Sequence, residues 1–158
     1  MRTYSSTYSS ASGTIIIESD GHELTRLRFA EDTINQTNGA DGMPIIEEVR
    51  QWLDDYFAGK QPCKVPRLNP QGTDFQRKVW QALFTIPYGQ TKTYGEIAKL
   101  VGCRSSRAVG QAIGHNPIAI IIPCHRVVGT NGTLGGYAWG LDIKQALLEL
   151  EHCPLGKK

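Results

Sequence analysis

The segment Ile122–Val127 (Ile-Pro-Cys-His-Arg-Val) places a thiol, an imidazole and a guanidinium side by side, directly after the apolar run 118–122. A cysteine is a strong nucleophile only as the thiolate, and adjacent positive charge or a base lowers its pKa. Cys124, which leaves an apolar run beside His125 and Arg126, is placed for such activation. The alternative is that Cys124 is a small buried hydrophobic residue, as most free cysteines are. The motif therefore indicates a candidate nucleophile.

Cys124 and His125 are neighbours in the chain, and neighbours in a regular element do not face each other. A direct thiol–imidazole pair is not expected, so a bridging water or a loop that turns both side chains inward is required. His125 also needs a third group that fixes its tautomer. Glu149 and Glu151 are the candidates for that group, and the side chain of Asn116 could hold the loop that carries Cys124.

A glycine-rich, aromatic run follows the motif. Residues 129–140 contain five glycines, with Asn131-Gly132 as a signal for a tight turn. A loop that carries Tyr137 and Trp139 could wall a flat pocket, and aromatic walls suit a planar nucleobase. A purely structural loop is the alternative, because glycine–aromatic runs alone are weak indicators.

The elements that must position these residues begin with strands followed by a helix. Residues 13–18 and 24–29 are strand-like, and Asp20-Gly21 between them is a hairpin signal. The stretch 44–57 begins with proline and has apolar residues at helical spacing. The segments 31–42 and 60–72 predict a loop and a linker.

The second part of the chain predicts helices. Capping boxes at Thr73–Gln76 and Thr93–Glu96 and a cap at Ser105 or Ser106 start three helices, over 74–84, 94–101 and 107–113. The last two surround a turn that contains Gly102, which matches a helix-turn-helix. We expect a small α/β N-terminal domain (a small β-sheet plus a helix) over 1–68 and a mainly helical C-terminal domain with the helix-turn-helix over 72–153.

The third of these helices has an unusual surface. Its apolar face consists of Val109, Ala112 and Ile113, and its opposite face consists of Arg107, Gly110, Gln111 and Gly114. The opposite face is almost bare, although glycine in a helix costs roughly 1 kcal/mol relative to alanine. Such a helix would enter a tight space better than it would read base edges with long side chains. Close packing against protein is the alternative, and both remain open.

Size and composition limit the class of protein to which the chain can belong. The 158 residues suggest one domain or two small ones, and no apolar run approaches the roughly 20 residues of a membrane helix. The first residues carry no apolar segment of signal-peptide type. We expect a protein of the cytoplasm, or of the nucleus in a eukaryote, without a membrane partner. Its four cysteines (Cys63, Cys103, Cys124 and Cys153) lack zinc-site spacing, which predicts free thiols and no bound metal.

Charge is unevenly distributed along the chain. Residues 1–75 contain seven Lys/Arg and eleven Asp/Glu, whereas residues 76–126 contain seven Lys/Arg and one Glu. This basic block includes the helix-turn-helix and the candidate nucleophile, which suggests a polyanionic partner. A solvated positive face without a partner is the alternative. Phosphate contacts by Lys92, Lys99, Arg104 or Arg107 would make nucleic-acid affinity fall with salt.

Taken together, these motifs resemble one family. Pro123–Val127, preceded by 107–110 (Arg-Ala-Val-Gly) and 114–117 (Gly-His-Asn-Pro), resembles the O-6-alkylguanine-DNA alkyltransferases, also called methylated-DNA–protein-cysteine methyltransferases. The resemblance extends in order from Gly72 to Glu151. It covers about the last half of the chain, and its several motifs together are specific. The N-terminal part fits the family's small α/β domain in outline.

The resemblance implies that Cys124 accepts an alkyl group, mainly methyl, from the O-6 atom of guanine in double-stranded DNA. His125 would act as a water-bridged base oriented by Glu151, and Asn116 would shape the active-site turn. Tyr94 would donate a proton to the base and press on the phosphate 3′ to it. Because the product is a thioether that water does not readily cleave, each molecule should act once and need no cofactor.

The resemblance also implies that the helix from Arg107 lies in the minor groove and that Arg107 fills the space of the flipped nucleotide. The other expected DNA contacts are Ala108, Gly110, Gln111, Gly114, Thr93, Lys92 and Arg104. The expected pocket residues are Tyr137, Ala138, Trp139 and Val127. We expect a monomer without an obligate protein partner.

The sequence departs from the family pattern at three places. Ala138 stands where some members have serine, so a hydroxyl contact to O-6 is lost, although the backbone amide could serve. Trp139 is bulky where many members have glycine, which predicts a narrow pocket that handles methyl better than benzyl adducts. Some members bind zinc in the N-terminal domain, but this region has His22 and no cysteine before Cys63, so we expect none.

Three other functions are compatible with parts of this pattern. A helix-turn-helix transcription regulator would need long polar side chains on its recognition helix, and Gly110 and Gly114 argue against it. A cysteine hydrolase predicts a burst followed by turnover, whereas an alkyltransferase predicts one transfer per protein. A family member that only binds DNA is disfavoured by the presence of Cys124.

Overall fold

The computed structural model describes residues 3–30, 40, 42–62, 64–130 and 133–152. The chain forms two compact units, Met1–Gln71 with Pro117–Ile121 and Gly72–Asn116 with Ile122–Lys158. Some expectations fall outside the described residues: nearly all of the predicted loop 31–42, the Asn131-Gly132 turn, Cys63 and Cys153.

The first unit contains a three-stranded antiparallel sheet in the order β1-β2-β3. Its strands are β1 (Tyr4–Ser10), β2 (Gly13–Ser19) and β3 (Leu24–Phe29). The Asp20 carboxylate stabilises the β2–β3 hairpin by accepting hydrogen bonds from the backbone N–H groups of His22 and Glu23. β1 is not predicted by the sequence, because its serines, threonine and tyrosines lack apolar alternation. It pairs with β2 along its whole length.

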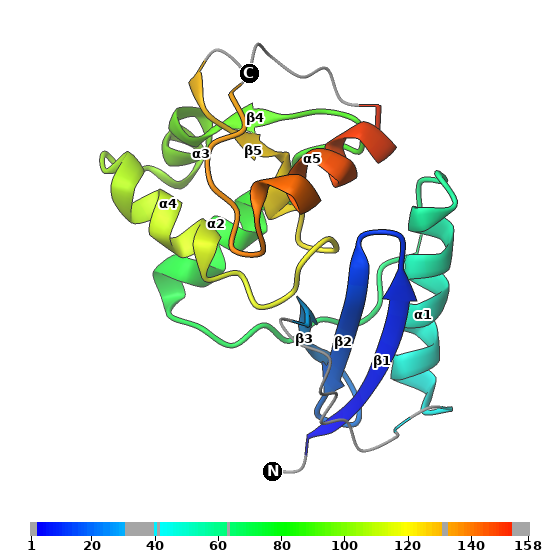
Figure 1. Cartoon of the computed structure of the whole chain (residues 1–158). Helices are drawn as coiled ribbons and strands as arrows, with labels where there is room; N and C mark the ends of the chain where they lie inside the picture. Colours follow the sequence, from blue (N-terminus) through cyan, green and yellow to red (C-terminus); the bar gives the residue numbers. More distant parts are fainter. Residues whose placement is uncertain (1–2, 31–39, 41, 63, 131–132, 153–158) are drawn as a thin grey trace. The chain divides into compact units, whose positions relative to one another are not determined.

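Helix α1 (Pro44–Phe57) packs against this sheet (Figure 1). Pro44 occupies the start of the helix, where its missing N–H costs nothing. The helix buries an apolar face that consists of Ile45, Ile46, Val49, Trp52, Leu53 and Tyr56. Burial of such side chains contributes roughly 1.5–3 kcal/mol each. The apolar segment Pro117–Ile121 completes this unit, because the backbone of Leu27 donates to Pro117 O and accepts from Ala119 N.

The second unit is mainly helical. Its elements are α2 (Asp74–Leu83), β4 (Lys92–Thr93), α3 (Tyr94–Val101), α4 (Ser106–Gly114), the 3-10 turn η1 (Cys124–Arg126), β5 (Val127–Val128) and α5 (Leu141–Leu150). Both predicted capping boxes are present, at Thr73 and Thr93, and Ser105 caps α4. Gly102 ends α3 with φ 70°, a left-handed conformation that favours glycine. The predicted fold class, including the helix-turn-helix of α3 and α4, is confirmed.

Phe75 is 37% exposed, whereas Val79, Trp80 and Leu83 are buried. Phe75 lies in the first turn of α2, before the three residues that are buried in this unit.

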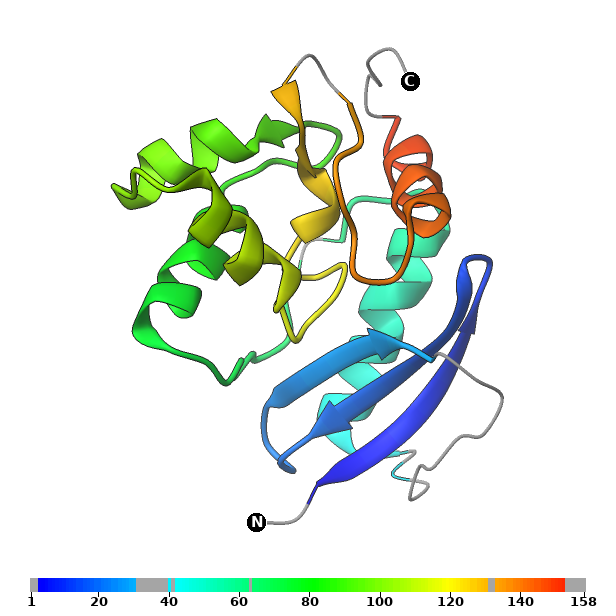
Figure 2. The same cartoon turned by 60° about the vertical axis from the view of Figure 1, so that its left-hand side comes forward.

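A pair of very short strands determines where the functional segments meet. β4 and β5 pair in parallel, with Lys92 opposite Val127 and Thr93 opposite Val128. The pairing brings the start of α3 beside the strand that follows η1. Both views show the segment after β5 (orange) passing between α4 and α5 (Figures 1 and 2). This segment therefore lies next to the bare helix that the sequence analysis singled out.

Among the helices that the structure describes, none combines the length and the apolar character required to cross a membrane.

Candidate active site

Cys124 begins η1 and is buried, with 4% of its surface exposed. The turn is tight, since the Cys124 N–H donates to Ile122 O at 2.7 Å. The buried side chain of Asn116 donates from Nδ2 to the same carbonyl at 2.9 Å. Asn116 thus links the end of α4 to the residues that present the sulfur, as the sequence analysis suggested.

His125, Arg126 and Glu151 form a buried network behind Cys124. Nε2 of His125 lies 2.6 Å from Glu151 Oε2, and Nε of Arg126 donates to Glu151 Oε1 at 2.8 Å. Arg126 also donates to Ile86 O at 2.8 Å. Two carboxylates were candidates for the group that fixes the tautomer of His125, and Glu151 is the one that pairs with it. Glu149 is exposed and accepts a hydrogen bond from Gln145 instead.

The electrostatics of this network determine its protonation. Burial would raise the pKa of Glu151, but the hydrogen bonds and charges of His125 and Arg126 outweigh it and hold the pKa at about 2. Burial lowers the pKa of His125, against the pull of Glu151. A neutral imidazole beside an ionised carboxylate carries its proton on Nε2 and donates it to Glu151. The lone pair of Nδ1 is then available as a base.

Cys124 itself is not a resting thiolate. Burial raises its pKa to about 11, although the Asn116 hydrogen bond and the charge of Lys144 act in the opposite direction. The motif predicts activation of the sulfur by neighbouring positive charge, but burial has the larger effect on the pKa of Cys124. Cys124 is therefore a neutral thiol at pH 7 that needs a base at the moment of reaction.

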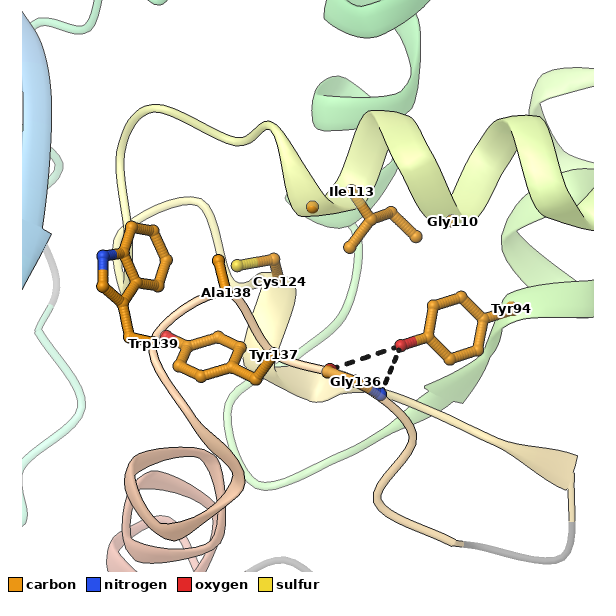
Figure 3. A pocket seen from close by; sticks show the side chains of 9 residues that line it. Tyr94, Gly110, Ile113, Cys124, Gly136, Tyr137, Ala138 and Trp139 are labelled. Carbon is orange, nitrogen blue, oxygen red and sulfur yellow. Dashed lines mark hydrogen bonds between the residues drawn. The ribbon is translucent and has the colours of Figure 1, made fainter.

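A cavity of about 170 Å³ adjoins the sulfur. Its lining consists of Tyr94, Gly110, Ile113, Gly114, Cys124, Gly136, Tyr137, Ala138 and Trp139. In Figure 3, Trp139 and Tyr137 lie on one side of Cys124 and Tyr94 lies across the pocket from them. The rings of Tyr137 and Trp139 meet edge to face, 5.4 Å between centroids. The cavity is thus a narrow space with aromatic walls and a thiol.

Two tyrosines line this cavity. Tyr94 bonds weakly to the backbone of Gly136, which donates to the hydroxyl at 3.3 Å and accepts from it at 3.4 Å (Figure 3). Burial raises the pKa of Tyr94. It raises the pKa of Tyr137 well above the ordinary value, and the nearby Cys124 adds to the shift. Both hydroxyls are therefore protonated at neutral pH.

The bare face of α4 borders the same cavity. A Cβ added at Gly110 would lie 3.9 Å from the Tyr94 ring, an ordinary contact, and one at Gly114 would meet no atom within 4 Å. Protein packing therefore does not require glycine at either position. The remaining space on this face is available to a molecule outside the chain.

The other expected DNA contacts lie around α3 and α4. Arg104, Arg107 and Gln111 are exposed, and Lys92, Thr93 and Ala108 are half-buried. The Thr93 hydroxyl already accepts the hydrogen bond of the helix cap. Among the expected pocket residues, Tyr137, Ala138 and Trp139 line the cavity, but Val127 does not. Val127 lies fully buried in β5, because its pairing with Lys92 turns it into the core.

Three residues of the site were missed. Ile113 was assigned to the core, and Gly136 was one glycine among several. Lys144 lies on the apolar stripe of α5 with Leu147 and Leu148, all three fully buried. A lysine at helical spacing from two buried leucines was the available signal. In the described part of the chain, no group of His, Cys, Asp and Glu forms a metal site.

Comparison with known families matches both parts of the chain. Residues 3–64 match the ribonuclease-like domain of 6-O-methylguanine DNA methyltransferase, and residues 74–153 match its DNA binding domain. A methylated-DNA–protein-cysteine methyltransferase of Methanosarcina acetivorans is 45% identical over 152 residues, which cover 94% of this chain and 97% of the relative. One from Mycobacterium tuberculosis is 47% identical and covers 92% and 90%.

A solved structure is similar over almost the whole length. The crystal structure of Mycobacterium tuberculosis OGT in complex with DNA has a TM-score of 0.84 and 45% identity. The similarity covers 96% of this chain and 95% of that one. The two units of this chain thus both have counterparts in a protein that was crystallised on DNA.

Proposed function

Since the chain belongs to the 6-O-methylguanine DNA methyltransferase family, we propose that it is a methylated-DNA–protein-cysteine S-methyltransferase that repairs guanine alkylated at O-6. It transfers the alkyl group, mainly methyl, irreversibly to its own Cys124. One observation carries this proposal: Cys124 lines a narrow aromatic cavity, and the next residue, His125, pairs with the buried Glu151.

The first step is the removal of the thiol proton. The proton passes from Cys124 through one water molecule to Nδ1 of His125, because Nε2 is committed to Glu151. Glu151 stays ionised and stabilises the imidazolium that forms. A general base of this kind contributes roughly 10²–10⁴ in rate. The raised pKa of Cys124 supports the need for it.

The second step is the displacement. The thiolate attacks the alkyl carbon, the bond between that carbon and O-6 breaks, and the electron pair returns to the guanine. A proton from the Tyr94 hydroxyl completes the normal base, and the proton held on His125 later restores Tyr94 through solvent. The product on Cys124 is a thioether, which offers water no carbonyl to attack. Each molecule therefore acts once, without a cofactor.

Double-stranded DNA is the partner. We place α4 in the minor groove, with Arg107 in the space that the flipped nucleotide leaves. Contacts of Ala108, Gly110, Gln111 and Gly114 follow from that placement, and Lys92, Thr93 and Arg104 contact the backbone nearby. The bare face of α4 beside the cavity supports this arrangement, because a flipped base must enter from the adjoining helix surface.

The proposal extends to the setting in which the protein works. It acts as a monomer without an obligate protein partner, in the cytoplasm, or in the nucleus if the source is a eukaryote. A cavity lined by residues of one chain supports action as a monomer, and a DNA substrate supports this location.

Intact-protein mass spectrometry tests the proposal. After incubation with DNA that contains O-6-methylguanine, the protein should gain about 14 Da on Cys124, with one equivalent transferred per molecule. Cys124→Ala should gain nothing, whereas Cys103→Ala, which changes another free cysteine, should react as the natural protein does. Repeated turnover would indicate a hydrolase. Binding at one defined DNA sequence without transfer would indicate a transcription regulator.

A further inference from the structure

Lys144 of α5 is fully buried and binds three backbone carbonyls. Its Nζ donates to Val127 O at 2.6 Å, to Gly136 O at 2.9 Å and to Leu134 O. An ammonium has three donors and no acceptor, so these carbonyls satisfy it completely. Burial lowers the pKa of Lys144 to about 8, and the group stays protonated at pH 7.

The three carbonyls belong to two segments that carry the active site. Val127 directly follows η1, which presents Cys124. Leu134 and Gly136 lie on the segment that continues into the cavity wall at Tyr137. No described hydrogen bond between backbone groups joins the segment 134–139 to β5. Lys144 therefore hydrogen-bonds to the nucleophile's strand and to the wall of the pocket at once. These bonds add to the packing of Leu134 against Val128 and to the hydrogen bonds between Tyr94 and Gly136.

Lys144 also lies near an aromatic ring and two titratable groups of the site. Its Nζ lies 5.9 Å from the centre of the Tyr94 ring. The titratable groups that it influences are Cys124 and His125, whose pKa values its charge lowers. Among the described residues, no carboxylate forms a salt bridge with this buried cation, whose charge acts on Cys124 and His125. A buried charge without a counter-ion is costly unless hydrogen bonds compensate it. The three carbonyls provide this compensation, so Lys144 can remain charged where it joins the two segments.

We propose that Lys144 is a positioning residue that holds the cavity wall 134–139 at a fixed distance from Cys124. The expected effect on the transfer rate rests on the proposed alkyl transfer. The three hydrogen bonds of Lys144, called the clamp below, are present in the free protein. Loss of the clamp should leave DNA binding nearly intact and slow the transfer step, because the flipped base would then meet the sulfur in a looser pocket. Misplacement of reacting groups by about 1 Å costs on the order of a hundredfold in rate.

Hydrogen exchange on the free protein tests the clamp without substrate. In Lys144→Met, which keeps the length of the side chain and removes the donors, the backbone amides of 134–139 should exchange faster while those of α2 are unchanged. Lys60→Met, an exposed lysine of the first unit, is the control and should leave both regions unchanged. Unchanged exchange of 134–139 in Lys144→Met would overturn the proposal.

The kinetic test separates positioning from general stability. At saturating methylated DNA, Lys144→Met should transfer methyl roughly ten- to a hundredfold more slowly, with its DNA dissociation constant within about twofold of the natural value. Lys144→Arg keeps the charge but not the three-donor geometry, and it should show intermediate exchange and an intermediate rate. If Lys144→Met does not fold, Lys144→Arg decides, and natural rates and exchange in that variant would overturn the clamp. Failure of the natural protein to transfer methyl would instead overturn the proposed function and leave the exchange result valid.

Discussion

Glu151 binds a different neighbour with each carboxylate oxygen, Oε2 with His125 and Oε1 with Arg126. Oε1 also accepts from the N–H of Gly89 at 3.2 Å. A buried carboxylate with this many donors remains ionised, which is the condition for orienting a neutral histidine. The residue lies at the C-cap of α5, so the end of this helix determines the geometry of the base.

Glu151→Gln should slow methyl transfer strongly while leaving the cavity in place. The amide keeps the shape but loses the charge that stabilises the imidazolium, so we expect a loss of roughly tenfold or more at saturating DNA. Removing one partner of a buried ion pair costs about 3–5 kcal/mol, so the free energy of unfolding should fall as well. Single-turnover kinetics and urea unfolding measure the two effects. Glu149→Gln, on the exposed side of α5, is the matched control and should change neither quantity.

The same network predicts how stability depends on pH. The pKa of Glu151 falls from 4.5 to about 2 on folding. The contribution of ionised Glu151 to the free energy of unfolding, of the order of 3 kcal/mol, is therefore complete above pH 4.5 and is lost as the pH falls toward 2. The pKa of His125 is also lowered in the folded state by burial, so a further loss begins as the pH falls below 6.5. Urea unfolding at several pH values should show both losses. Glu151→Gln should lack the loss of stability below pH 4.5. An unchanged dependence of stability on acid pH in that variant would contradict the assignment of this loss to Glu151.

Trp139 sets the width of the cavity. Its ring meets Tyr137 edge to face and lines the space beside Cys124. The natural protein should therefore react faster with methylated DNA than with benzylguanine, and Trp139→Gly should raise the benzylguanine rate more than the methyl rate. Competition kinetics with both substrates measure the ratio. Equal inactivation rates of the natural protein by both substrates would contradict a narrow pocket.

At this scale the sequence predicted which residues meet but not how they are protonated. The motif of Cys124, His125 and Arg126 and the distant Glu151 were named from residue type and resemblance. The pKa of Cys124 was not predictable, because it depends on burial by segments far apart in the chain. The role of Arg126 as a partner of Glu151, not of the thiol, depends on the same tertiary packing.

At the scale of elements, α4 combines low helix propensity with an open surface. Glycine within the helix lowers its stability, and nothing in the described structure requires that glycine for packing. Gly110→Ala should therefore raise the free energy of unfolding by up to about 1 kcal/mol. It should also weaken binding to methylated DNA, because the added methyl group projects into the space assigned to the minor groove.

Thermal unfolding and a DNA-binding isotherm together test this exchange of stability for function. Gln51→Ala on the exposed side of α1 is the control, and it should leave DNA affinity unchanged. A Gly110→Ala protein that is more stable and binds DNA as tightly as the natural one would place this face of α4 outside the interface.

Elements with local signals were predictable, and elements that depend on distant partners were not. The capping boxes of α2 and α3 operate within four residues, so the sequence alone located both helix starts. β4 and β5 contain two residues each, too few for a periodic pattern, and they exist only because the chain brings them together. β1 was missed for a related reason: its polar residues become a strand by pairing with β2.

At the scale of the whole molecule, charge is divided along the chain. The N-terminal region, 1–75, has an acidic excess, and the block 76–126 has a basic one. Two of the exposed arginines of that block, Arg104 and Arg107, belong to the turn and the helix of the helix-turn-helix. The net charge of +2 conceals this asymmetry, and the asymmetry predicts how the protein approaches a polyanion.

Counterion release makes this prediction quantitative. Each phosphate that a lysine or arginine neutralises adds about −0.9 to the slope of log affinity against log salt concentration. Arg104→Ala should therefore reduce the steepness of that slope by about one, whereas Arg26→Ala, an exposed arginine on β3, should leave it unchanged. Fluorescence anisotropy with unmodified duplex DNA at several salt concentrations measures the slopes without any transfer chemistry. Because non-specific binding is almost entirely electrostatic, equal slopes for both variants would mean that the basic block does not face DNA. The proposed placement of α4 would then be wrong even if Cys124 still accepted methyl.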